Sequence, residues 1–102
     1  MSLLSVTFHC ENNALPKWEA YMSGEMISRV EKWGHSYIIS EVETEMLQEG
    51  KNFNILLDFK SPIERESFLN DYFADFAESI KETFSDKVMI FVTILNSKRR
   101  GN

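Results

Sequence analysis

The chain of 102 residues carries 16 acidic and 11 basic residues, which gives a net charge of -5, and 43% of its residues are hydrophobic. This size and composition are typical of one globular domain and exclude a disordered chain. A net negative surface repels a phosphate backbone, so the charge argues against a nucleic-acid partner.

The residue types that mark membranes, secretion and metal sites are scarce. Apolar residues occur in short runs, well below the roughly 18 consecutive ones that a membrane span needs, and residues 1–5 lack the features of a secretory signal. Cys10 is the single cysteine and His9 and His35 are the only histidines, so neither an internal disulfide nor a zinc or iron–sulfur cluster is expected. We therefore expect a soluble, cytoplasmic protein with no membrane segment, no metal and no cofactor.

Residues 3–10 alternate apolar with polar side chains, which predicts a half-buried strand. A helix follows, with Asn12 or Asn13 as its N-cap and Pro16 in its first turn. Gly34 ends this helix because glycine accepts the left-handed conformation at that position without cost. Gly24 inside the helix predicts close packing against another element, with a local bend of the helix as the alternative. The apolar stripe of the helix consists of Leu15, Trp18, Met22, Met26, Val30 and Trp33.

The segment 37–44 reads as a less regular strand, and its charged residues place it at an edge of the sheet. A polar loop with Gly50 separates it from a clearly alternating strand at 53–59, so the two strands form a hairpin. We interpret the acidic residues near the hairpin as a solvated edge rather than a cation site: Glu41, Glu43, Glu45 and Glu49.

The sequence Ser61-Pro62-Ile63-Glu64 predicts the start of a second helix, with Ser61 as N-cap and the Glu64 side chain reaching back to the Ser61 N–H. Ser85 and Asp86 end this helix. Its predicted apolar stripe is Leu69, Tyr72, Phe73, Phe76, Ile80 and Phe84. Its predicted solvent face is Glu64, Arg65, Asp71, Asp75, Glu78 and Lys81.

The last strand, residues 87–95, is apolar on both faces and has no charge after Lys87. A strand with one face in water alternates apolar with polar residues, so this strand needs cover on both sides. One face carries Val88, Ile90, Val92 and Ile94, and the other carries Met89, Phe91, Thr93 and Leu95. Residues 98–102 are expected to be a disordered basic tail outside a single domain of residues 1–97.

The order strand, helix, strand, strand, helix, strand predicts an α+β, ferredoxin-like βαββαβ fold. Right-handed crossovers place the first and third strands in the middle of a four-stranded antiparallel sheet and both helices on one face. Hiding Met89, Phe91 and Leu95 on the other face at about 25 cal/mol per Å² favours a partner. A homodimer packed through these faces is predicted, and a cleft for a small-molecule ligand is the alternative.

Several short sequences place the chain beside a known family. These are Val6-Thr7, Trp18 and Met22, Trp33-Gly34, Leu57-Asp58-Phe59, and Phe91-Val92-Thr93-Ile94-Leu95. Their layout, over nearly the whole chain, resembles an uncharacterised family of small bacterial proteins classed as a domain of unknown function. The resemblance implies the dimeric α/β barrel type of the ferredoxin-like fold. The chain departs from that family at Met26-Ile27-Ser28, where members often have His-Ile-Pro, and the family implies no activity.

The sequence favours a homodimeric ligand-binding or protein-interaction module, and there are two alternatives to this interpretation. An RNA-binding domain with the same element order would need Phe53 on the open face and Asp58 buried beneath the helices, which is costly. A small-molecule enzyme, resembling a cofactor-independent oxygenase or isomerase, would use His9 as its acid or base. We expected Asn54 opposite His9 and Phe91 or Met89 on its other side. Because a lone histidine more often serves as a hydrogen-bonding group, the enzyme remains the alternative.

Overall fold

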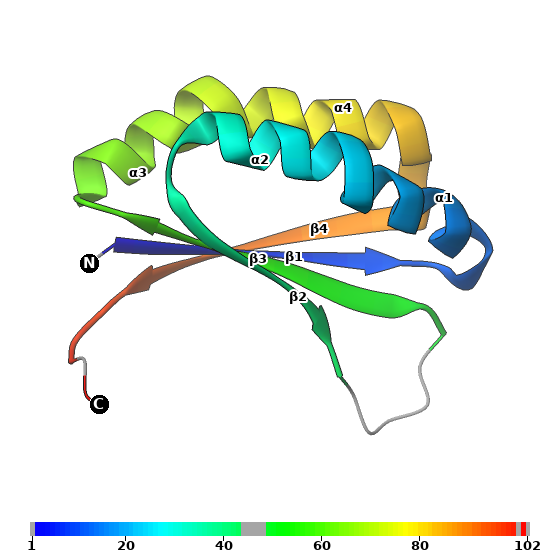
Figure 1. Cartoon of the computed structure of the whole chain (residues 1–102), viewed down its shortest axis with the longest axis horizontal. Coiled ribbons are helices and arrows are strands. Elements are labelled where there is room, and N and C mark those ends of the chain that lie inside the picture. Colours follow the sequence, from blue (N-terminus) through cyan, green and yellow to red (C-terminus); the bar gives the residue numbers. More distant parts are fainter. Residues whose placement is uncertain (1, 44–48, 100, 102) are drawn as a thin grey trace.

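The computed structural model describes residues 2–43, 49–99 and 101, and it forms a four-stranded antiparallel sheet with helices on one face (Figure 1). The predicted ferredoxin-like α+β fold is confirmed. The elements are β1 (Ser2–Cys10), α1 (Leu15–Tyr21), α2 (Ile27–Trp33), β2 (Ser36–Val42), β3 (Lys51–Phe59), α3 (Pro62–Phe68), α4 (Ala74–Phe84) and β4 (Val88–Asn96). Thr44, Glu45, Arg100 and Asn102, which the predicted edge strand, acidic patch and tail include, lie outside the described residues.

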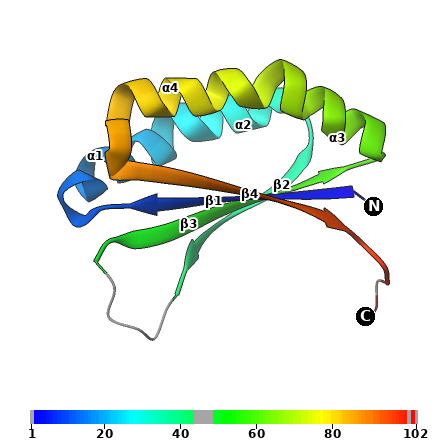
Figure 2. The same cartoon turned by 180° about the vertical axis from the view of Figure 1, so that it is seen from behind.

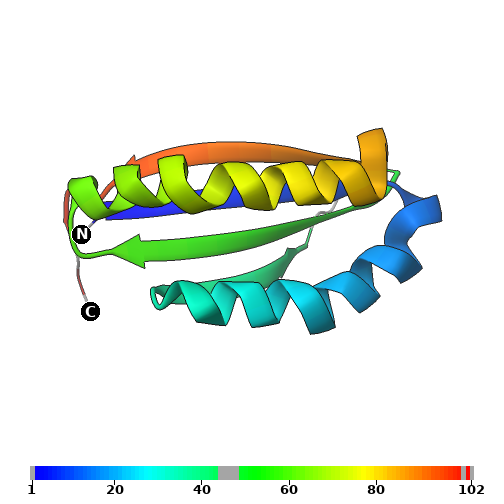
Figure 3. The ribbon, with the colours of Figure 1, turned by 90° about the horizontal axis from the view of Figure 1, so that it is seen from above.

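The strand order is β2-β3-β1-β4, so β1 and β3 are central, as predicted. Val6 in the middle of β1 lies opposite Ile55 of β3 on one side and Val92 of β4 on the other. Seen from above, two helical rods lie on the same side of the sheet (Figure 3). The first rod consists of α1, α2 and the turn that joins them, and the second consists of α3, α4 and the turn that joins them. Within the described residues, every helix is too short or too polar to span a membrane.

Aromatic side chains fill the space between sheet and helices. Trp18 is fully buried, and its ring centroid lies 5.1 Å from that of Phe8 and 5.2 Å from that of Phe84. Phe76 joins the second helical rod to the first through Trp33, at 5.0 Å between ring centroids. The contacts tie both rods to β1, and large buried rings of this kind dominate the energy of a core.

The first helical rod differs from prediction at its start and its middle. Ala14 occupies the N-cap position without a capping side chain, after a 3₁₀ turn at Asn12–Ala14. Asn12 instead accepts a hydrogen bond from the Gly50 N–H at 3.1 Å. Gly24 is exposed and has no atoms near the position of a Cβ, so close packing is not its role. It lies in a π-helical turn, Met22–Met26, a wider turn that joins α1 to α2.

The second rod begins as predicted, with the Glu64 N–H donating to Ser61 Oγ at 3.2 Å. The Glu64 side chain, however, accepts from the Lys60 N–H rather than from Ser61. In the first half of the rod the predicted stripe is confirmed at Leu69 and Phe73, which are half-buried against the core, and wrong at Tyr72, which is exposed. Phe68 and Arg65, which the predicted stripe left out, are buried. A π-helical turn at Leu69–Phe73 rotates the residues before it relative to those after it, which a regular 3.6-residue repeat does not anticipate.

Arg65 is 6% exposed and lies where β1 begins and β4 ends. Its Nη1 donates to the Leu95 carbonyl at 3.0 Å and to the Leu3 carbonyl at 3.3 Å. Its Nη2 donates to Asn96 Oδ1 at 3.1 Å. A side chain expected to face water therefore ties α3 to the two strands.

The helices cover only the first part of β4. Val88 is buried and Ile90 is half-buried, but Val92 is 41% exposed and Ile94 is 50% exposed. The predicted burial of these last two residues under the helices was wrong. β4 bends away from α3 and α4 as it runs toward the C-terminus, and the end of the strand meets the polar Arg65 rather than an apolar side chain (Figure 2).

Candidate functional site

The helix-free side of the sheet, here called the open face, is polar in the middle and apolar at its edges. The two central strands contribute Ser5, Thr7, His9, Asn52, Asn54 and Asp58 together with Leu3 and Leu56. The edge strands contribute the exposed apolar residues Ile38 and Val42 from β2 and Met89, Phe91 and Leu95 from β4. Ser36 and Ser40 of β2 and Thr93 of β4 lie on the same face between or beside them. Alternation along each strand generates this arrangement, since every second side chain points to the open face.

The strand register brings His9 beside Asn52, not Asn54. His9 Nδ1 lies 2.6 Å from Asn52 Oδ1, and Met89 is the neighbour of His9 on β4. Asn54 and Phe91 flank Thr7 instead, so the expected pairing of His9 with Asn54 was wrong. Of the two residues expected on the other side of His9, Met89 is the one that lies there.

Asn54 organises a second polar group at the centre of the open face. Its Nδ2 donates to Ser5 Oγ at 2.8 Å and to Thr7 Oγ1 at 3.1 Å. Both amide hydrogens are thereby used within the protein, whereas the two hydroxyls keep acceptor and donor capacity. A ligand above this centre would meet hydroxyl groups held in position by Asn54.

His9 is half-buried and has one ring nitrogen engaged. Because an amide oxygen only accepts, the tautomer that fits this contact has its proton on Nδ1 and its acceptor at Nε2. Asp58, the carboxylate on the strands' open face, lies six residues from Asn52 along β3, roughly 20 Å at the rise of a strand. His9 is therefore not part of an acid–base pair among the described residues, and they contain no group of three or more side chains arranged to hold a metal ion.

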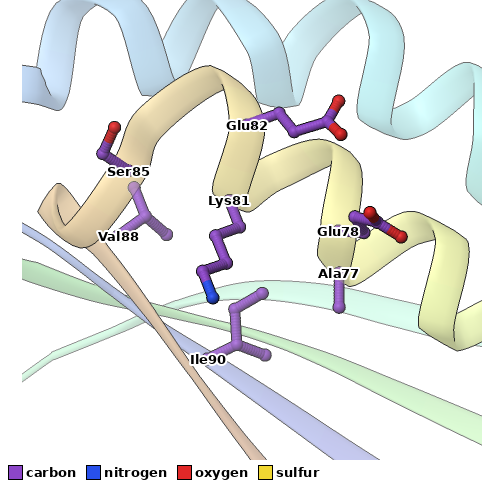
Figure 4. Close-up of a pocket in the computed structure, with 7 residues that line it drawn as sticks. All are labelled: Ala77, Glu78, Lys81, Glu82, Ser85, Val88 and Ile90. Carbon is purple, nitrogen blue, oxygen red and sulfur yellow. The ribbon is translucent and has the colours of Figure 1, made fainter.

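Two hollows lie on opposite sides of the sheet. One, of about 440 Å³, is on the open face near Asp58 and is lined by Leu3, Ser36, Tyr37, Ile38, Leu56, Asp58 and Ser97. The other, of about 830 Å³, lies between α4 and β4 on the helix side, where Lys81 reaches down toward Ile90 (Figure 4). The second hollow has no set of polar groups converging on a common point, so the open face is the better candidate.

Sequence reasoning placed His9, Asn54 and Phe91 on the open face and chose Met89, Phe91 and Leu95 as its exposed apolar residues. The structure places all five there. Asn52 was missed because it was assigned to the hairpin loop. Ile38 and Val42 were missed because β2 was considered only as a charged edge, although its period-two pattern contained them.

Comparison with known proteins supports the fold and leaves the activity open. A search of curated proteins found no match. A proposed antibiotic biosynthesis monooxygenase from Deinococcus radiodurans is 12% identical, with a TM-score of 0.67 over 100% of this chain and 97% of that chain. A dimeric ferredoxin-like protein from an uncultured marine organism is 16% identical, with a TM-score of 0.61 over 100% and 99% of the two chains.

A de novo designed protein, Foldit4, is also similar, at 8% identity and a TM-score of 0.60 over 95% of this chain and 98% of that chain. Likeness at these identities concerns the fold alone, and one fold hosts many functions. The model of a sequence family matches residues 1–98. Since that match covers nearly the whole chain, the protein belongs to the family described as a domain of unknown function (DUF4286).

Proposed function

We propose that the protein is a homodimer in which two open faces pack against each other and enclose a binding site for a small molecule. The observation that carries this proposal is the division of the open face into apolar edges and a polar centre. The apolar edges suit a protein interface, whereas the polar centre suits a ligand.

The exposed edge residues favour association. Phe91 is 52% exposed and Ile38 is 61% exposed, and Met89, Leu95 and Val42 extend the same two edges. At roughly 25 cal/mol per Å² of apolar surface, covering these side chains contributes several kcal/mol before the costs of association are subtracted. The dimeric ferredoxin-like protein has a similar fold, and this similarity supports the same kind of assembly here.

The polar centre opposes a completely dry interface. The Ser5 and Thr7 oxygens accept from Asn54, but burying the open face against an apolar surface would leave their O–H donors and the free ring nitrogen of His9 without partners, at a cost of about 1–3 kcal/mol each. A cavity that holds a small polar molecule avoids this cost. The site residues in this proposal are His9, Asn52 and Asn54, with Phe91 at the apolar edge.

The second candidate is a small-molecule enzyme in which His9 acts as general base. It is favoured by the Asn52 contact, which leaves Nε2 as the acceptor and thus the atom able to take a proton. The first candidate remains preferred because the described residues supply no acid or nucleophile beside that atom.

The assembly is tested by light scattering on a size-exclusion column, where a homodimer has twice the 11.9 kDa mass of one chain. Phe91→Lys should give the monomer mass because a lysine cannot be desolvated in the apolar edge. Ile63→Lys is the matched control, since Ile63 is 81% exposed but lies on α3, away from the open face. A monomeric wild-type chain at micromolar concentration would refute the dimer.

The ligand site is tested by NMR with a library of small neutral polar compounds, observed through the side-chain amide signals of Asn52 and Asn54. Compounds that bind should shift both signals, and His9→Leu should abolish the shifts. His35→Gln is the control, because His35 packs against Phe59 on the helix side of the sheet. Shifts that persist unchanged in His9→Leu would remove His9 from the site.

A further inference from the structure

We propose that Asp58 and the hollow around it form a binding site for a small primary alkylammonium ion. This inference goes beyond the proposed function, because the hollow is built within one chain and lies at the other end of the open face from His9.

The hollow combines one carboxylate with aliphatic walls. Asp58 is half-buried and lies opposite Ser36 on β2 and Leu3 on β1. Ile38 and Leu56 form the next open-face pair, two residues further along β2 and β3. Ser97 follows the end of β4. The volume of about 440 Å³ is in the range of small-ligand sites.

The Asp58 carboxylate has no positive partner among the described residues. The salt bridge found there joins Lys51 Nζ to Glu41 Oε1 at 3.5 Å, at the other end of β3. On the described strands, the open-face positions contain no lysine or arginine. A partly buried carboxylate without a counter-charge is costly, so a cation that enters the hollow gains more than it would at an exposed carboxylate.

The chemistry of the lining selects the kind of cation. An ammonium group offers three donors, and the carboxylate of Asp58 and the hydroxyl of Ser36, which lie opposite each other on β3 and β2, provide acceptors for it. Leu3, Ile38 and Leu56 offer apolar contact to an alkyl chain. A divalent metal ion is a poorer fit because it requires several oxygen ligands, commonly including more than one carboxylate. An anion is disfavoured by the charge of Asp58 itself.

The same ammonium chemistry is available from two sources. One is a free small amine, and the other is the side chain of Lys98, which directly follows Ser97 in the chain. The experiment below separates them.

The test titrates n-butylammonium chloride into the full chain and follows the backbone amide signals of Ser36, Ile38, Leu56 and Ser97. Saturable shifts are expected with n-butylammonium and not with sodium butyrate, 1-butanol or sodium chloride at the same concentrations. Equal shifts with 1-butanol would overturn the proposal, because they would show an apolar hollow with no cation preference.

Asp58→Asn should weaken n-butylammonium binding at least tenfold, and Asp58→Glu should retain most of it. Asp86→Asn is the matched control, because it removes an exposed carboxylate outside the sheet and changes the net charge equally. Unchanged binding in Asp58→Asn would overturn the proposal. Retained binding in Asp58→Glu together with its loss in Asp58→Asn excludes a simple folding defect.

Lys98→Gln identifies the source of the cation. If n-butylammonium binds more tightly to this variant than to the wild type, the Lys98 side chain competes for the hollow and is its natural occupant. If the affinity is unchanged, the occupant is a free amine. Both results support recognition of an ammonium group. Repeating the titration with Phe91→Lys separates this proposal from the dimer, since the hollow should bind n-butylammonium in the monomeric variant as well.

Discussion

The two edges of the sheet differ in how they meet solvent. β2 has seven residues and exposes Glu41, which pairs with Lys51 at 3.5 Å, and the exposed Glu43 follows it. β4 has nine residues, no charge, and exposed apolar side chains on both of its faces. Charged residues at an edge oppose pairing with another chain, whereas an uncharged edge invites it.

This difference indicates that association is directed to one side of the molecule. Both edges contribute apolar residues to the open face. On the helix side, Tyr37 and Ile39 of β2 pack against the core and are followed by the charged Glu41, whereas β4 leaves Val92 and Ile94 exposed. Charge thus protects β2 against pairing, whereas the exposed apolar side chains of β4 are the part of the sheet that the proposed dimer would cover. Substitutions near each of the two edges test this contrast.

Gly50→Ala should disrupt the packing of the turn before β3 against the end of β1. Gly50 has a φ of 91°, and the added Cβ would overlap the carbonyl oxygen of Cys10. The free energy of unfolding should fall by about 3 kcal/mol, from backbone strain and the clash together. Urea unfolding monitored by tryptophan fluorescence measures it. Gly24→Ala is the control and should be neutral or stabilising because the space around Gly24 is empty. Equal stability of the two variants would contradict the assigned role of Gly50.

Arg65→Ala should loosen the β4 side. The change removes two hydrogen bonds that hold the end of β4 to α3 and a third to Leu3 of β1, and it leaves a cavity. The free energy of unfolding should fall by about 2 kcal/mol. Amide hydrogen exchange should accelerate more at Leu95 than at Ile38, on the opposite edge. Uniform acceleration across both edges would show that Arg65 does not act on β4 in particular.

Ile38→Lys compares the edges directly in the dimer. Ile38 is flanked on its face of β2 by serines, whereas Phe91 has Met89 beside it on β4. Ile38→Lys should therefore weaken the dimer by about tenfold, or ~1.4 kcal/mol, and less than Phe91→Lys does. Dissociation constants from sedimentation equilibrium provide the measurement. An effect of Ile38→Lys as large as that of Phe91→Lys would make the two edges equivalent.

Cys10 lies opposite Val88, at the end of β4 that the helices bury. The ionisation of its thiol therefore tests whether that end of the strand stays buried. Burial, assisted by the nearby charges of Glu11 and Glu19, raises the pKa of the Cys10 thiol from its ordinary value of 9.0 to about 11. Between these values the unfolded chain releases its thiol proton more readily than the folded one. The contribution of the protonated thiol to the free energy of unfolding is therefore fully present below pH 9 and is lost as the pH rises toward 11.

From pH 8 to 9.5 the expected loss of unfolding free energy is on the order of 1 kcal/mol. Urea unfolding in the presence of a reductant measures this loss, and the loss should be smaller in Cys10→Ala. A wild-type loss that matches that of Cys10→Ala would show that the thiol is not protected.

Much of the fold could be predicted because its signals are local. The alternation in β1 and β3, the Ser61 cap and the Gly34 helix end, with its φ of 75°, depend on neighbouring residues. The π-helical turns could not be predicted from a regular repeat, and they moved Tyr72 out of the core and Arg65 into it. For the site, His9 and Phe91 were placed on the correct face, but the partner of His9 was not.

The sequence by itself determined which side chains share a face of each strand, because alternation is a property of consecutive residues. It also determined that β4 would be apolar on both faces. Only the tertiary structure decided that Asn52 rather than Asn54 meets His9, that Arg65 closes the end of β4, and that Asp58 faces a hollow. These outcomes depend on strand register and helix placement, which contacts between residues far apart in the chain set, and no local pattern encodes them.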